Sequence, residues 1–319
     1  MSDPGFPAYL SGQIAVLSAY FDESARGDDL LILGGFVSTS DKWVEFSQRC
    51  DQLKREFAIP YFHSAGIFSH TPTSRYRHLS WPRRLELAAK FTRTITDCVE
   101  SSIVVTVIPR EYNRLTDQRW RSRHGTCYGA CFQWLLVALF ETLCLPHETE
   151  TKVSIFLEDG HRHAGEAEQV LREWKALADD DPEMKIIGRR PYPLKIAGYG
   201  RLTKEDSPPL WAADLISYCF YKQVVYRDKR FSELTQEIGA RVPISGICID
   251  SHKIELMKET VIRSDVETDE WRRDTHQLIK FGHQFGLKVS KHKKGVLLDF
   301  AGMTPEQIGG FLGGGRLLK

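Results

Sequence analysis

The order of its periodic segments predicts that this chain is a mixed α/β protein, with a sheet flanked by helices. Runs rich in β-branched and aromatic residues alternate with longer segments whose apolar residues recur at helical spacing. Its 319 residues suffice for one large domain, or for one domain with a smaller appendage. Hydrophobic residues make up 42% and charged residues 27%, which is typical of a folded protein and predicts no long disordered segment.

The first part of the chain predicts a hairpin, a helix and a loop. Residues 14–21 and 30–38 form strand-like runs on either side of a turn cluster. Ser40 or Asp41 can cap a helix that ends before Pro60. Residues 61–80 are weakly periodic and rich in turn formers, so we expect a long surface loop of the kind that often carries function.

The middle of the chain continues the alternation of helices and strands. The expected elements are a helix over 81–100, a strand over 102–109, a short polar helix, a long helix over about 125–145, a strand over 152–157, a helix over about 164–178, a strand over 184–188 and a helix that carries Asp214.

After Tyr226 the pattern changes, which predicts a main domain over 1–226 and a C-terminal extension over 227–319. The extension contains a short strand or buried loop at 244–250, an amphipathic helix over 267–285, a basic stretch at Lys291–Lys294 and a glycine-rich end. These features indicate no role for it.

Charge and cysteine content restrict the possible environments. Lys+Arg and Asp+Glu number 43 and 42, so the net charge neither supports nor excludes nucleic acid as a partner. Seven cysteines form no even framework, which favours reduced thiols in the cytoplasm. A zinc site at Cys127, Cys131, Cys144 and His147 is the alternative, but the spacing is unlike that of known zinc motifs and favours small buried side chains.

No segment predicts export or membrane insertion. The first residues lack a basic stretch followed by an apolar core, so we expect no secretory signal. The most apolar helical stretch, over 131–145, contains Gln133 and Glu141 and is shorter than the roughly 20 residues that span a bilayer. We therefore predict a cytoplasmic protein without a membrane partner.

Asp214 is the candidate site residue that the sequence isolates most clearly. It is the only charged residue in the apolar run Pro208–Tyr221, seven positions into a predicted helix and beyond any capping role. An ionised carboxylate among apolar side chains needs an ion-pair partner, hydrogen bonds or a metal. A salt bridge to a buried arginine is the structural alternative.

Other acidic residues stand where predicted strands end. Asp22 and Glu23 follow the first strand, and Glu158 and Asp159 follow a later one. In α/β sheets, sites form at the carboxyl ends of strands. Carboxylates brought together there repel one another unless a cation neutralises them, and oxygen ligands suit Mg²⁺ or Mn²⁺. The alternative is that these residues are turn formers and caps.

Four motifs together resemble the family named domain of unknown function 3800, over about residues 14–226. They are Tyr20–Ser24, Leu33–Val37, Phe62-His63 and Trp211–Ile216. The resemblance implies a ribonuclease H-like fold with helical insertions. It also implies acidic site positions at Asp22 and Asp214, with Glu158 or Asp159 as the intermediate carboxylate, and it brings His63 in as a proton shuttle.

The chain departs from the family pattern at two positions. Ala25 stands where glycine is frequent, and Trp211 where glutamine is common. A ribonuclease H site usually also has a glutamate on a helix, and the sequence does not choose between Glu45, Glu56 and Glu86. Glu23 could replace it only if the strand end twists, because adjacent strand residues point to opposite faces.

Basic residues suggest where nucleic acid would bind. Arg119, Arg121 and Arg123 surround Trp120, and Arg189 and Arg190 follow a predicted strand. Basic residues interleaved with aromatic ones can bind phosphates and stack bases, but a solvated helix face explains the first group equally well.

The hypothesis that combines these observations is a nuclease that uses Mg²⁺ or Mn²⁺ to hydrolyse phosphodiester bonds of RNA or DNA. Asp22, Glu158, Asp159 and Asp214 would bind the metal. The alternative is a non-catalytic ribonuclease H-like module that binds nucleic acid or a protein partner in a mobile-element or phage-defence system. A hydrolase with a serine nucleophile has little support, because no Gly-x-Ser-x-Gly elbow is present.

Overall fold

The chain divides into two compact units, Met1–Ser251 and His252–Lys319. The computed structural model describes residues 16–143, 151–160, 163–179, 194–255, 258, 288–292 and 295–299. Within its described part the second unit contains an antiparallel hairpin of β7 (Lys288–His292) and β8 (Gly295–Asp299). The elements described below belong to the first unit.

A six-stranded mixed sheet forms the centre of the first unit, in the order β5-β4-β1-β2-β3-β6. Its strands are β1 (Val16–Arg26), β2 (Leu30–Thr39), β3 (Ser101–Val107), β4 (Thr151–Glu158), β5 (Leu194–Leu202) and β6 (Ile244–Ile249). Strand β2 pairs antiparallel with both β1 and β3. Strand β4 lies parallel to β1, β5 parallel to β4, and β6 parallel to β3. The prediction of a mixed sheet flanked by helices is confirmed.

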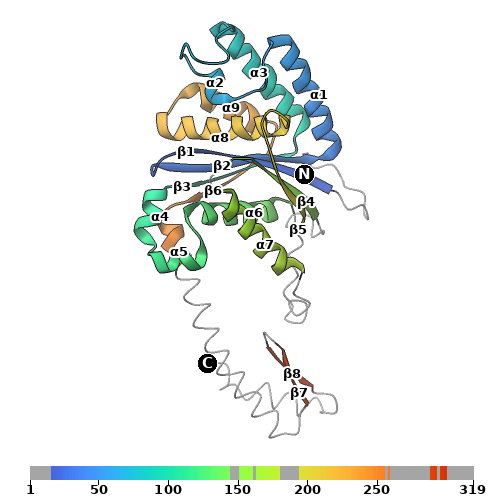
Figure 1. The fold of residues 1–319 in the computed structure, drawn as a ribbon, viewed down its shortest axis with the longest axis vertical. Coiled ribbons are helices and arrows are strands. Elements are labelled where there is room, and N and C mark those ends of the chain that lie inside the picture. Colours follow the sequence, from blue (N-terminus) through green and yellow to red (C-terminus); the bar gives the residue numbers. More distant parts are fainter. Residues whose placement is uncertain are drawn as a thin grey trace, which may run out of the picture. The chain divides into compact units, whose positions relative to one another are not determined.

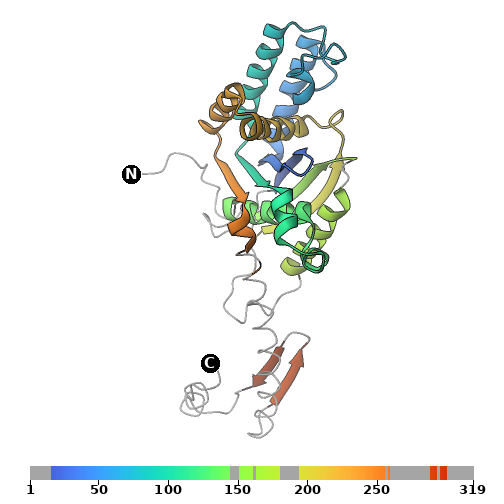
Figure 2. The same cartoon turned by 90° about the vertical axis from the view of Figure 1, so that its left-hand side faces the viewer.

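Helices cover both faces of this sheet. They are α1 (Ser40–Phe57), α2 (Ser64–Ile67), α3 (Trp81–Cys98), α4 (Pro109–Leu115), α5 (Gln118–His124), α6 (Cys127–Leu143), α7 (Ala164–Asp179), α8 (Pro208–Tyr226) and α9 (Lys229–Gly239). In Figure 1, α8 lies against one face with α1, α3 and α9 around it, and α6 and α7 cover the other face. The two helical layers remain separate when the molecule is turned by 90° (Figure 2).

The hairpin of β1 and β2 sets the position of Asp22. A turn at residues 27–29 joins the strands, and Gly27 adopts a φ of 50°, which glycine accepts without steric cost. Strand β1 continues through residue 26, so Asp22 lies within the strand, opposite Gly34, and does not follow the strand as predicted. Because Phe21 pairs with Leu157 of the parallel β4, the next residues, Asp22 and Glu158, are neighbours.

Helix α8 packs unusually close to the sheet because residue 34 is glycine. A Cβ built on Gly34 would lie 2.7 Å from Oγ of Ser217 and 3.3 Å from a methyl group of Ile216. The Ser217 hydroxyl lies 3.0 Å from the Asp22 carbonyl and 3.2 Å from the Gly34 carbonyl, to which it donates. The helix is therefore held against β1 and β2 at the level of Asp22.

Several elements differ from the predictions. The expected strand over 184–188 lies outside the described residues, as does the helix expected over 267–285, and the strand beside β4 is β5 at 194–202. The loop over 61–80 contains the short helix α2, and the single polar helix is two helices, α4 and α5. The compact unit extends past the predicted boundary at 226, because β6 pairs with β3.

The described residues include most of the cysteines and the apolar helices that the sequence contains. Six described cysteines are free, five of them buried and Cys248 exposed. Cys144 and His147 of the alternative zinc site lie outside the described residues. Over the part of the chain that the structure describes, none of the helices has the length and apolar character needed to cross a bilayer.

We expect Gly34→Ala to lower the free energy of unfolding by roughly 1–3 kcal/mol, because the added methyl group overlaps the Ser217 hydroxyl and pushes α8 away from the sheet. Chemical denaturation followed by circular dichroism measures this change.

Gly198→Ala is the matched control, since Gly198 is also a strand glycine but a Cβ there meets no atom within 4 Å. The control is expected to be neutral or slightly stabilising. Equal destabilisation by the two changes would contradict the close packing of α8 at Gly34.

Candidate active site

Three carboxylates from separate elements converge on one ammonium group. Nζ of Lys204 lies 2.8 Å from Oδ2 of Asp22, 2.8 Å from Oδ1 of Asp214 and 3.1 Å from Oε2 of Glu158. Asp22 comes from β1, Glu158 from the end of β4 and Asp214 from α8, while Lys204 follows β5. Three of the predicted site residues are thus brought together, around a lysine that the prediction lacked.

The loop before α2 fixes the second oxygen of Asp214. The backbone N–H of Ser64 donates to Oδ2 of Asp214 at 2.6 Å. Nε2 of His63 lies 3.9 Å from the other carboxylate oxygen, Oδ1. The preceding residue, Phe62, anchors this loop in the core, where its ring stacks on Phe91 with centroids 4.1 Å apart. His63 is therefore held at the edge of the site, partly open to solvent.

The backbone of Lys204 is anchored independently of its side chain. The indole N–H of Trp211 donates to the Lys204 carbonyl at 2.5 Å. A turn of Thr203, Asp206 and Ser207 closes the same loop, with the Ser207 N–H donating to the Thr203 carbonyl at 3.0 Å. Trp211 therefore positions the residue at the centre of the cluster.

Burial and mutual repulsion divide the electrostatic roles of the carboxylates. Burial raises the pKa of Asp22 well above its usual value, and the charges of Asp214 and Glu158 raise it further, against the opposing effect of Lys204. Burial also acts to raise the pKa of Asp214, but Lys204, His63 and the Ser64 hydrogen bond outweigh it and lower that pKa. Asp214 is consequently the more firmly ionised of the two aspartates.

The same interactions keep Lys204 charged. Burial acts to lower the pKa of the Lys204 ammonium, but Asp214, Asp22 and Glu158 together raise it above its ordinary value. Three carboxylates and one ammonium leave two negative charges in excess when all are ionised. The cluster therefore attracts cations even with Lys204 in place.

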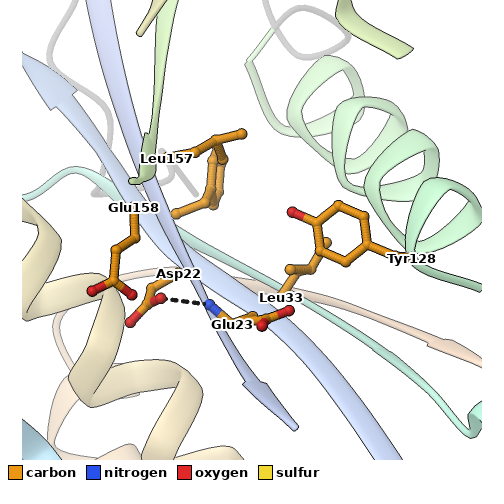
Figure 3. A pocket seen from close by; sticks show the side chains of 7 residues that line it. Asp22, Glu23, Leu33, Tyr128, Leu157 and Glu158 are labelled. Carbon is orange, nitrogen blue, oxygen red and sulfur yellow. Dashed lines mark hydrogen bonds between the residues drawn. The ribbon is translucent and has the colours of Figure 1, made fainter. Parts of the chain in front are cut away.

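The remaining acidic candidates lie elsewhere. Figure 3 shows the carboxylates of Asp22 and Glu158 on one side of β1, while Glu23 points to the other side, toward Tyr128. This alternation is that expected for adjacent strand residues. Asp159 is exposed, and its backbone N–H donates to the Leu202 carbonyl at 2.8 Å. Of the two residues at the end of β4, Glu158 is the one that reaches the cluster.

The three helix glutamates proposed as an additional ligand form surface ion pairs instead. Glu45 pairs with Arg49 on α1, while Glu56 and Glu86 pair with Lys90. Each of the three side chains is at least 40% exposed. None of them contributes a carboxylate to the cluster around Lys204.

The predicted nucleic-acid-binding arginines have different environments. Arg119 is exposed on α5, whereas Nη1 of Arg121 donates to the carbonyls of Asn113 and Thr116 and thereby closes the α4–α5 connection. The side chain of Arg123 and both Arg189 and Arg190 lie outside the described residues. Arg121 therefore has a structural role in this part of the chain.

A different arginine lies near the cluster. Arg75 stacks over the ring of Tyr61, with its Cζ 4.7 Å from the ring centroid, and donates to the Tyr61 hydroxyl. The Tyr61 ring lies 6.4 Å from that of His63. Arg75 is exposed, so a solvated guanidinium lies on the Tyr61 ring, which in turn lies next to His63.

Sequence reasoning missed Lys204 because it predicted no strand over residues 194–202. Had residues 194–202 been identified as the strand, Lys204 would have stood two residues beyond its end, at the same sheet edge as Glu158. Arg75 lies in the loop that was predicted to be functional, but no pattern distinguishes it there from Arg77.

The donor chemistry of the cluster fits a divalent cation, but the present spacing is that of ligands around an ammonium. Carboxylate oxygens are the ligands that Mg²⁺ and Mn²⁺ prefer. Over the described residues, no three His, Cys, Asp or Glu side chains form a ready metal-binding group. A metal bound by Asp22, Glu158 and Asp214 would take the position that Lys204 Nζ occupies.

Comparisons with known proteins give structural neighbours only. No protein-family model matches the sequence, and no curated protein matches it either. Among solved structures, Bst-RNase HIII in complex with Mn²⁺ is 13% identical with a TM-score of 0.35, over 69% of this chain and 55% of that one. A mutant of the same enzyme is 14% identical with the same TM-score and coverage.

A further neighbour is the RNase HII of the PCNA:RNase HII complex from Archaeoglobus fulgidus. It is 18% identical with a TM-score of 0.28, over 78% of this chain and 90% of that one. Because the TM-scores are below 0.5, we base no functional argument on these similarities. The chain spans about half the length of the RNase HIII structures. The strand order confirms the mixed α/β sheet that the sequence predicts, and its assignment to the ribonuclease H-like folds stays a prediction.

We expect Asp214→Asn to lower the free energy of unfolding at pH 7 by about 1–3 kcal/mol, because the amide cannot accept from both Ser64 N–H and Lys204. The folded-state pKa of Asp214 is lowered, so its contribution is fully present above the unfolded pKa of about 3.9 and is lost as pH falls through the folded pKa. Denaturant unfolding between pH 7 and pH 3 tests this.

Asp97→Asn provides the control for Asp214→Asn. Asp97 pairs with Arg49 at 2.9 Å, but its side chain is 42% exposed, so its loss is expected to change the free energy of unfolding by less than about 1 kcal/mol. The change in the free energy of unfolding caused by Asp214→Asn should depend on pH and exceed that of Asp97→Asn. A change that is independent of pH, or no larger than that of Asp97→Asn, would contradict the pairing of Asp214 with Lys204 and Ser64.

Proposed function

We propose that this protein is a nuclease that depends on a divalent metal and hydrolyses phosphodiester bonds of RNA or DNA. The observation that carries the proposal is that Asp22, Glu158 and Asp214, from two adjacent parallel strands and one helix, all lie within 3.1 Å of one cationic position. The resemblance to the domain of unknown function 3800 family, with Asp22 and Asp214 at its acidic positions, supports the same conclusion.

In this proposal Asp22, Glu158 and Asp214 hold Mg²⁺ or Mn²⁺, which would activate water and stabilise the leaving oxygen. Ser64 orients Asp214 through the backbone N–H, so that one carboxylate oxygen remains directed at the cation position. His63 lies at the solvent side of the same carboxylate and can accept or donate a proton at Nε2. Asp159 takes no part in this proposal, because its side chain is exposed whereas Glu158 reaches Lys204.

The substrate would approach from the side of His63. Arg75 presents a guanidinium to solvent there, and Tyr61 holds it by stacking and by its hydroxyl. Guanidinium groups bind phosphate oxygens with two parallel hydrogen bonds. A nucleic acid with one phosphate on Arg75 would place a neighbouring phosphodiester near the carboxylates.

A non-catalytic module that binds nucleic acid or a protein partner is the second candidate. The position of Lys204 favours it, since an ammonium already compensates the buried carboxylates without a metal. The two candidates differ in whether the purified protein cleaves nucleic acid. A role in a mobile-element or phage-defence system stays a prediction under both.

We expect Asp22→Asn and Glu158→Gln to reduce cleavage of RNA, DNA or their hybrid by at least about a hundredfold, because each removes one carboxylate from the cation position. The assay uses labelled substrates with Mg²⁺ or Mn²⁺, and with a chelator in a parallel reaction. Asp159→Asn is the matched control, being one residue from Glu158 but exposed, and should cleave like wild type. Cleavage that survives both substitutions would exclude this active site.

We expect Arg75→Ala to weaken binding of single-stranded nucleic acid by roughly tenfold or more, because it removes a charged contact to phosphate. Fluorescence anisotropy measures the affinity, and its dependence on salt concentration should become shallower by about one ion. Arg77→Ala, two residues along the same exposed loop, is the control. An equal loss in both variants would argue against a specific phosphate site at Arg75.

A further inference from the structure

The ammonium of Lys204 and a divalent metal require the same position. All three carboxylates lie 2.8–3.1 Å from Nζ, which is hydrogen-bonding distance for an ammonium. Mg²⁺ binds carboxylate oxygens at about 2.0–2.1 Å, so a metal held by the same three oxygens would lie within the volume of the ammonium. One cation must therefore leave before the other binds.

We propose that Lys204 is a displaceable internal cation, which fills the carboxylate cluster in the metal-free protein and competes with the divalent metal for it. This inference rests on the proposed metal site. In this role the lysine stabilises the carboxylate cluster when no metal is bound. It also sets the affinity of the cluster for the metal, because the metal must displace it.

The charge of the cluster favours an exchange of this kind. When all three carboxylates are ionised, two excess negative charges remain with Lys204 in place, and a divalent cation in its place leaves one. The raised pKa of Asp22 shows that the ammonium alone does not offset the burial and repulsion of the carboxylates. The ammonium is therefore an incomplete counter-ion. It offsets enough repulsion to allow Asp22 and Asp214 to be buried, yet leaves a net attraction for a more highly charged ion.

The geometry of Lys204 permits its side chain to move while its backbone stays fixed. The Trp211 hydrogen bond and the turn over residues 203–207 hold the main chain. The ammonium is carried on a flexible four-carbon stem, and 9% of the side chain is exposed, so part of the side chain already reaches solvent. Rotation about the side-chain bonds can bring the ammonium to solvent without unfolding the loop.

Loss of the Lys204 ammonium should affect thermal stability differently without and with a divalent metal. Without metal, a variant that lacks the ammonium has three carboxylates facing one another with no counter-ion, and its melting temperature should be below that of wild type. When Mn²⁺ binds to the same variant, no free energy is lost in displacing the lysine. Its melting temperature should therefore rise more steeply with metal concentration than that of wild type. A merely structural lysine would give the first effect without the second.

The test compares Mn²⁺ binding by full-length wild type and Lys204→Met, since methionine keeps an unbranched side chain of similar length. Thermal melting at increasing Mn²⁺ gives the midpoint of stabilisation, and electron paramagnetic resonance of free Mn²⁺ gives the affinity independently of folding. We expect Lys204→Met to bind Mn²⁺ at least about tenfold more tightly. Lys90→Met, which removes a lysine paired with Glu56 and Glu86, should bind like wild type.

The outcomes separate the displacement from the metal site itself. Tighter binding by Lys204→Met, with or without measurable binding by wild type, supports the competition. Equal or weaker binding by Lys204→Met overturns it and leaves the metal site standing. Absence of binding by both overturns the proposed metal site and this inference with it. If Lys204→Met does not fold, Lys204→Gln, which retains a hydrogen-bond donor, is measured in the same way.

Discussion

The architecture of the site depends on one ammonium group that contacts three carboxylates. Asp22, Glu158 and Asp214 reach Lys204 only because β4 lies parallel to β1 and ends beside Asp22, and because α8 crosses both β1 and β2 closely. Gly34 permits that approach, and the Ser217 hydroxyl fixes it. Trp211, on the same helix as Asp214, holds the backbone of Lys204. Strand order, helix packing and loop anchoring thus together bring the three carboxylates and the ammonium to one position.

Such an arrangement is costly without a cation. Asp22 and Asp214 are both buried, and removal of one partner from a buried ion pair costs about 3–5 kcal/mol in measured cases. The raised pKa of Asp22 and the lowered pKa of Asp214 show how the cluster distributes its single positive charge. Asp22 within β1, Glu158 at the end of β4 and Asp214 on α8 surround one cation position, with His63 at its edge, and in the proposed function this position takes the metal. The contacts of Lys204 with the same three carboxylates explain how the lysine stabilises the cluster when no metal is bound.

The sequence predicts those parts of the site that depend on local pattern. Asp214 stands out because its neighbours are apolar, and Asp22 and Glu158 because strands end near them. Long-range features are not accessible in the same way. The sequence predicts no strand over 194–202, so it gives Lys204 no position in the sheet, and it assigns the residues of β6 to a separate extension. The choice between Glu158 and Asp159 depends on strand register, and the pairing of Glu56 with Lys90 depends on the packing of α1 against α3. Glu45 and Glu86 pair with basic residues four positions along their own helices. The backbone contact from Ser64 to Asp214 joins residues 150 positions apart and has no sequence signal.

The central claim is that Asp22, Glu158 and Asp214 form a site for a divalent cation. The most direct measurement is a crystal structure of the full chain grown with Mn²⁺, with anomalous differences used to locate the metal. The account predicts a peak about 2.1 Å from one oxygen of each of the three carboxylates, with Nζ of Lys204 moved away from them. A map without a metal at the carboxylates, and with Lys204 still bound to all three at saturating Mn²⁺, would contradict it.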